Sequence, residues 1–168
     1  MSQLSLSIES SLLVRDVAGE YRPANADEVL QAAQRLLGTQ LRGREVLTSP
    51  QAVRDFLRVK LGALEHEVFA VLMLDAQNRL IEYVELFRGT VSQASVYPRE
   101  VVKESLALNA AAAIFCHNHP SGVAEPSRAD EVLTSTLKTA LSLDDVRVLD
   151  HLNVAGNDVM SFAERGLL

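Results

Sequence analysis

Cysteine and clustered positive charge are both scarce in this chain of 168 residues. The single cysteine, Cys116, excludes an internal disulfide framework and a cysteine-based zinc ribbon, and it is typical of a reducing compartment. No apolar run reaches the roughly 18 residues of a membrane span, and the start, MSQLSLSIES, has no basic residue before an apolar stretch. A net charge of −6 disfavours broad attraction to nucleic-acid phosphates. We therefore expect a cytoplasmic protein that neither enters a membrane nor binds nucleic acid through its overall charge.

Two helices are predicted in the first part of the chain. The stretch YRPANADEVLQAAQRLLGTQL predicts a turn and then a helix whose cap is either Asn25 or Asp27. In LTSPQAVRDFLRVKLGALEHE, Ser49 can cap a second helix, Pro50 suits its first position and Gly62 is expected to help end it. The hydrophobic share of 48% is enough for a real core, so we expect one domain with a small helical appendage.

Strands alternate with helices after residue 66. EVFAVLMLDAQNRLIEYVELF consists of two apolar runs around a polar turn, which predicts a β-hairpin whose first strand is central in a sheet. A helix from Pro98, a strand AAIFCHNH, a helix SRADEVLTSTLKTALSL and a strand DVRVLDHLNVAG follow. This order predicts an α/β or α+β domain with a mixed β-sheet flanked by helices.

The segment CHNHPSGVAEPSRAD carries the candidate site. On a strand His117 and His119 face the same way, with Cα atoms about 6.5 to 7 Å apart, so their imidazoles can converge on one ion. Asp130, in the first turn of the next helix, leans back toward the end of that strand. Two histidines and one aspartate leave a fourth position of a tetrahedral zinc open, as in catalytic sites, where a bound water has its pKa lowered to about 7.

A purely structural interpretation covers part of the same segment. Ser127 followed three residues later by Asp130 resembles a helix capping arrangement, which needs no metal. That interpretation leaves the two histidines unexplained on a largely apolar strand, where burying them unpaired is unfavourable. Asn118 and Cys116 point to the opposite face, so we expect both to be structural.

This segment resembles the JAMM motif of MPN-type metalloproteases. The shared pattern is His-x-His, then seven residues of which the first is Pro120, then Ser, two further residues and Asp. Its positions here are His117, His119, Ser127 and Asp130. The run HNHPSG, with RGTVSQASVYPREVVKESLALNAAA before it and VRVLDHLNVAG after it, resembles the RadC family in particular. The resemblance implies an MPN/JAB-like, cytidine-deaminase-like domain over residues 47–168, preceded by a helical N-terminal extension over residues 1–46.

The same resemblance implies roles for individual residues. Zinc would be bound by the two histidines and Asp130, and a glutamate upstream in the sequence would help to activate a water molecule. Glu67 occupies that place at the start of its strand, although the glycines of the family's pattern are replaced by Ala70 and Leu74, and Glu85 is the second candidate. By the same analogy, Ser127 would hydrogen-bond the substrate carbonyl or its tetrahedral oxyanion.

Three functions are compatible with these observations. The first is a zinc-dependent hydrolase, a metallopeptidase that cuts an amide or isopeptide bond in a protein or peptide substrate. The second is a DNA-associated repair or recombination accessory protein in which the metal is structural or vestigial. Longer RadC proteins resemble a fusion of this domain to an N-terminal helix-hairpin-helix-like segment associated with DNA binding. We expect residues 1–46 to be too short to contain that segment, which disfavours the second function. The third is phosphodiester cleavage. A homodimer that pairs the apolar strand EVFAVLML is left open.

The remaining polar residues near the motif are weaker candidates. His151 is expected to support the site from behind or to pack in the core, and Glu125 is not expected to be a ligand. Arg88, Tyr97 and Arg99 either line a substrate groove or are simply solvated.

Overall fold

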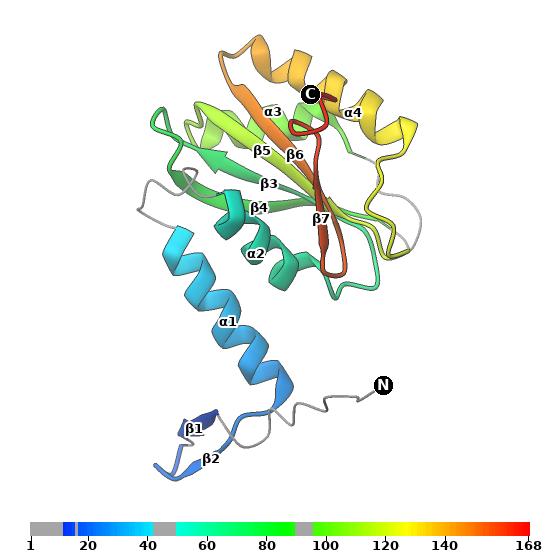
Figure 1. Ribbon diagram of the computed structural model, residues 1–168. Coiled ribbons are helices and arrows are strands. Elements are labelled where there is room, and N and C mark those ends of the chain that lie inside the picture. Colours follow the sequence, from blue (N-terminus) through cyan, green and yellow to red (C-terminus); the bar gives the residue numbers. More distant parts are fainter. Residues whose placement is uncertain (1–11, 16, 42–49, 90–95) are drawn as a thin grey trace.

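A five-stranded mixed sheet lies at the centre of the computed structural model, which describes residues 12–15, 17–41, 50–89 and 96–168 (Figure 1). The strand order is β4-β3-β5-β6-β7, formed by β3 (Val68–Leu74), β4 (Leu80–Arg88), β5 (Ala112–Asn118), β6 (Arg147–Ala155) and β7 (Asp158–Ser161). β5 and β6 are parallel, and the other neighbouring strands are antiparallel. The predicted mixed sheet is confirmed.

Helices cover both faces of this sheet, which is why every residue of β3 is buried. α2 (Pro50–Leu61) packs on one face, whereas α3 (Pro98–Ala107) and α4 (Arg128–Ser142) pack on the other (Figure 1). The α2 side buries Val53, Phe56, Leu57 and Leu61 against Ala70, Leu72, Ile114, Cys116, Leu152 and Val154. The α3/α4 side buries Val101, Leu137 and Leu141 against Phe69, Val71, Met73 and Phe115. We call these the α2 face and the α4 face.

The predicted bounds of α2 are confirmed at both ends that the structure describes. The helix begins at Pro50 and ends at Leu61, directly before Gly62. A Cβ atom at Gly62 would lie 2.5 Å from the carbonyl oxygens of Arg58 and Gly156, so only glycine fits there. The proposed cap Ser49 and the proposed boundary at residue 46 lie outside the described residues.

A small antiparallel pair, β1 (Leu13–Arg15) and β2 (Tyr21–Pro23), precedes α1 (Ala26–Leu41) at the N-terminal end (Figure 1). The sequence predicted the helix but not this pair. Asn25 caps the helix, since its side chain accepts a hydrogen bond from the Glu28 amide at 2.9 Å and the Glu28 carboxylate accepts one from the Asn25 amide at 2.9 Å. Among the helices in the described ranges, none is long and apolar enough to cross a membrane.

Candidate metal centre

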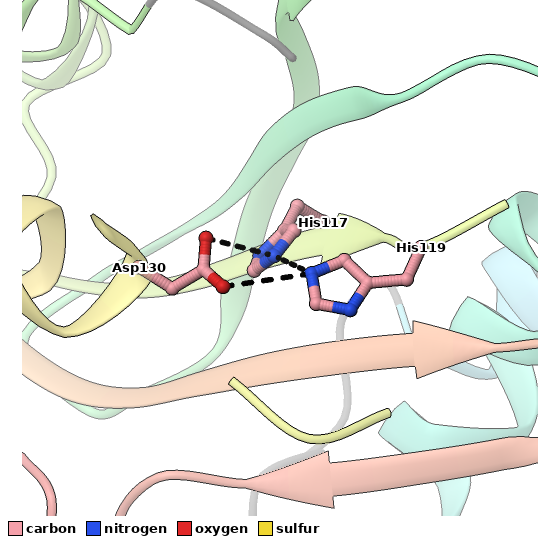
Figure 2. Close-up of side chains that lie close together, drawn as sticks. All are labelled: His117, His119 and Asp130. Atoms are coloured by element: carbon pink, nitrogen blue, oxygen red, sulfur yellow. Dashed lines mark hydrogen bonds and ion pairs between the residues drawn. The ribbon is translucent and has the colours of Figure 1, made fainter. Parts of the chain in front are cut away.

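His117 and His119 converge with Asp130 on the α4 face of the sheet, at the end of β5 (Figure 2). The two imidazole Nε2 atoms lie 2.7 Å apart. Asp130 Oδ1 lies 3.4 Å from His117 Nε2, and its Oδ2 lies 3.6 Å from His119 Nε2. One ligand atom from each of the three residues lies within 4.8 Å of the ligand atoms of the other two. The structure therefore brings together the three residues that the sequence predicted as ligands.

The first turn of α4 aims Asp130 at the histidines. Ser127 Oγ accepts a hydrogen bond from the Asp130 amide at 3.2 Å, and Asp130 Oδ2 accepts hydrogen bonds from the Ser127 amide at 2.7 Å and from Ser127 Oγ at 2.8 Å. This is a capping box, so the capping interpretation is confirmed. It does not compete with the clustering, because the cap itself fixes the carboxylate and leaves Oδ1 facing His117.

The outward nitrogens of both imidazoles are hydrogen-bonded. His119 Nδ1 lies 2.7 Å from the carbonyl oxygen of Val123, and His117 Nδ1 lies 2.8 Å from His151 Nε2. A carbonyl oxygen only accepts, so His119 carries a proton on Nδ1 and, when neutral, presents a bare Nε2 to the cluster. The loop that supplies Val123 turns back at Gly122, whose amide donates to the His119 carbonyl and whose φ is +79°.

The charges of the cluster favour a cation between these side chains. Burial lowers the pKa of His117 to about 4, so this imidazole is neutral at pH 7. A hydrogen bond that the protonated ring donates to the Asp130 carboxylate raises the pKa of His119. Burial alone would raise the pKa of Asp130, but the hydrogen bond with His119, the nearby His117 and the Ser127 cap hold it well below its usual range. An ionised carboxylate therefore faces two imidazole nitrogens.

The donor set fits a divalent metal ion. Two ligand atoms of a tetrahedral zinc, each 2.0 to 2.1 Å from the ion, lie about 3.3 Å apart, close to the two histidine–aspartate distances of 3.4 and 3.6 Å. The two Nε2 atoms at 2.7 Å are closer than that and would have to part by about 0.6 Å. A proton shared between them satisfies the nearer spacing, and a metal ion held by both would satisfy the wider one.

Of the two candidate glutamates, only Glu67 lies on the histidine side. It directly precedes β3, it is half-buried, and its charge contributes to the raised pKa of His119. Glu85 instead pairs with Ala70, on the α2 face, where it accepts a hydrogen bond from Tyr83 Oη at 3.2 Å. A register shift in β4 at this point decides which face Glu85 occupies.

Asn118 points away from the histidines, as predicted, and ties their strand to the segment around Glu67. Its Oδ1 accepts from the Val68 amide at 2.8 Å, and its Nδ2 donates to the His66 carbonyl at 2.9 Å. Cys116 is fully buried on the same face and its thiol donates to the Ala70 carbonyl. Both residues are structural.

His151 lies directly behind His117, in agreement with the role expected of it, and it contacts Thr134, a residue that sequence reasoning missed. Thr134 Oγ1 lies 2.6 Å from His151 Nδ1, and it donates to the Asp130 carbonyl at 2.6 Å. The available signal was the i, i+4 spacing of Asp130 and Thr134, which puts both on one face of α4.

Asn153 sits beside His117 in the sheet, on the α4 face, and both polar atoms of its side chain are buried with no partner among the described residues.

The other candidates lie outside the cluster. Glu125 forms a two-pronged ion pair with Arg165, with both N–O distances 2.8 Å. Tyr97 is 61% exposed and packs its ring edge-on against Phe87, the strand neighbour of Phe69. Arg88 and Arg99 are exposed.

Comparison with known proteins gives a consistent result over most of the chain. The family model described as RadC-like JAB domain matches residues 47–167. A UPF0758 protein of Leptothrix cholodnii is 65% identical over 150 residues, which cover 89% of this chain and 68% of the relative. A UPF0758 protein of Methylibium petroleiphilum is 60% identical over 167 residues, or 95% and 75% of the two chains. One of Nitrosomonas eutropha is 57% identical over 150 residues, or 89% and 67%.

Proposed function

The chain belongs to the family of RadC-like JAB domains, and from this premise we propose that it is a zinc-dependent hydrolase that cleaves an amide or isopeptide bond of a protein or peptide. The observation that carries the proposal is the pair of histidine Nε2 atoms 2.7 Å apart beside an ionised Asp130. Hydrogen bonds occupy the Nδ1 atom of each ring, on the side away from the cluster, so the two Nε2 atoms are the ring nitrogens left to bind an ion.

His117, His119 and Asp130 would hold the ion. Two imidazole nitrogens and one carboxylate form the three-ligand set that catalytic zinc sites use, with a position left for water or substrate. When bound, zinc would polarise the scissile carbonyl and make an attacking water acidic enough to react near neutral pH. The remaining chemistry falls to side chains of this chain.

Glu67 is the proposed general base. Its carboxylate would take a proton from the attacking water and later deliver it to the leaving nitrogen, which is the proton transfer that amide cleavage requires. Its support is its place on the histidine side, close enough to His119 to influence the pKa of that ring. Glu85 lacks this support because it lies across the sheet.

Ser127 is the proposed donor to the carbonyl oxygen as negative charge develops there. Its side chain is exposed at the start of α4, directly beside Asp130. The hydroxyl proton now goes to Asp130 Oδ2 at 2.8 Å, so binding a substrate carbonyl would require the hydroxyl to rotate.

An amide is favoured over a phosphodiester by the number of ligand groups. Phosphodiester hydrolases commonly hold two ions about 3.5 to 4 Å apart. Within the described ranges, His117, His119 and Asp130 form the one group of three or more side chains that could hold a metal ion. A single ion with a glutamate beside it is the arrangement of hydrolases that cut amides.

The test is a hydrolysis screen of the zinc-loaded full chain against unfolded proteins, isopeptide-linked peptides and an activated phosphodiester. Glu67→Gln should lower the rate of amide cleavage by about 10²- to 10⁴-fold, while the matched control Glu85→Gln on the opposite face leaves it unchanged. Equal activity of Glu67→Gln and wild type would refute the base assignment. Cleavage of the phosphodiester alone would refute the substrate class.

A further inference from the structure

A chain of three hydrogen bonds runs behind His117 and returns to the turn that carries Asp130. His117 Nδ1 and His151 Nε2 are 2.8 Å apart, His151 Nδ1 and Thr134 Oγ1 are 2.6 Å apart, and Thr134 Oγ1 and the Asp130 carbonyl oxygen are 2.6 Å apart. His151 is 0% exposed and Thr134 is 1% exposed, so water does not supply alternative partners.

The donor and the acceptor of each of these three hydrogen bonds can be assigned by starting from the Asp130 carbonyl. The Asp130 carbonyl can only accept, so the single hydroxyl proton of Thr134 points to it and the oxygen lone pair is left for His151. His151 must then carry its proton on Nδ1. If it is neutral, its Nε2 is an acceptor, and His117 Nδ1 must be the donor. His117 is thereby left with a bare Nε2, the atom that faces His119 and Asp130.

The surroundings of His151 keep it neutral. Phe162 stacks on its ring at 4.6 Å between centroids, and Phe69 and Phe115 meet it edge-on at 5.8 Å each. A charged imidazole would lose its hydration in this apolar enclosure. If His151 carried both protons, it would donate to His117 Nδ1 and force the His117 proton onto Nε2, where it would block metal binding.

We propose that His151 and Thr134 are positioning residues that hold His117 in its Nδ1–H tautomer and so reserve Nε2 for the metal ion. This inference rests on the proposed function in one respect, namely that the ligand of the bare Nε2 atom is a metal ion. In proteins a ligating histidine is commonly oriented by a carboxylate or carbonyl behind it. Here a second histidine, His151, takes that place. Its own tautomer is fixed by the hydroxyl of Thr134, one helical turn after Asp130.

Simple packing would give a different result on substitution. The aromatic enclosure fits a planar ring, so His151→Phe would fill it without either hydrogen bond. Thr134→Val keeps the shape of the side chain and removes only the hydroxyl, whereas Thr134→Ser keeps the hydroxyl and loses a methyl group. If His151 only packs, His151→Phe and Thr134→Val should bind zinc as wild type does.

The experiment uses the full chain and zinc alone, with two measurements on wild type, Thr134→Val, Thr134→Ser and His151→Phe. Competition with a chromophoric chelator gives the zinc affinity, and ¹⁵N-resolved NMR of the imidazole rings without metal gives the tautomer of His117. We expect Thr134→Val and His151→Phe to bind zinc about 10- to 100-fold more weakly and to lose the pure Nδ1–H form of His117. Thr134→Ser should match wild type in both measurements.

The two measurements separate failure of this inference from failure of the proposed function. A wild type that binds no zinc but shows the Nδ1–H form, lost in Thr134→Val, refutes the metal site and supports the positioning. An unchanged tautomer in Thr134→Val and His151→Phe overturns the positioning, whatever the zinc affinity. If His151→Phe fails to fold, the isosteric Thr134→Val, compared with Thr134→Ser, decides the question.

Discussion

Replacing Asn118 with alanine should destabilise the fold strongly while leaving metal binding intact. The side chain is 2% exposed and joins the end of β5 to the segment before β3, through the Val68 amide at 2.8 Å and the His66 carbonyl at 2.9 Å. Asn118→Ala leaves both backbone groups unpaired. An unpaired buried group costs about 1–3 kcal/mol. The Val68 amide is buried and the His66 carbonyl only partly so, and the expected loss is therefore about 2–4 kcal/mol, a large part of a total stability of roughly 5–15 kcal/mol.

Denaturant unfolding measures this loss, and thermal unfolding should show a midpoint lower by at least about 4 °C. The matched control is Asn157→Ala, the same change at an exposed turn residue, which should stay within about 0.5 kcal/mol of wild type. Zinc affinity should be unchanged in both, because Asn118 faces away from the histidines. An Asn118→Ala variant as stable as the control would refute the role assigned to these hydrogen bonds.

Three further changes test other parts of the structure. Ser127→Ala should lose about 1 kcal/mol of stability to denaturant, because the α4 cap is removed, and Ser127→Thr should retain it; equal losses would argue against the cap. Asn153→Leu should gain about 1–3 kcal/mol, because both buried amide atoms lack partners among the described residues, and a loss would reveal a partner such as ordered water. Burial raises the pKa of the Cys116 thiol above its ordinary value of 9.0, so its contribution to stability is fully present below pH 9 and is lost as pH rises further. Denaturant unfolding between pH 8 and 11 should therefore fall more steeply for wild type than for Cys116→Ala, and parallel curves would contradict this.

The clustering of the histidines with Asp130 was predictable from sequence because it depends on local rules. Residues 117 and 119 share a face on any strand, and a capping box fixes the first turn of any helix. Strand β5 and helix α4 are also strongly patterned, so their bounds differ little from those expected. The short strands β1, β2 and β7 were missed because three or four residues hold too little pattern to recognise.

The choice between the two glutamates was beyond the sequence. In a regular ladder continuing from the Phe69–Phe87 pair, Glu85 would oppose Val71 and share the histidine face. The register shift instead places it opposite Ala70, and so on the α2 face. The contact between His151 and Thr134 was equally hidden, because it depends on how α4 packs against β6. The spacing of Asp130 and Thr134 along α4 indicates only that these two residues share a face of the helix.

Metal content shows whether His117, His119 and Asp130 hold a metal ion. The measurement is mass spectrometry of the untagged protein after zinc is supplied, with wild type beside His119→Ala and Asp130→Ala. We expect about one zinc per chain in wild type and its loss in both variants, each shown to be folded by circular dichroism. A folded wild type that retains no zinc would contradict the proposed metal site and leave only a strand, a turn and a capped helix.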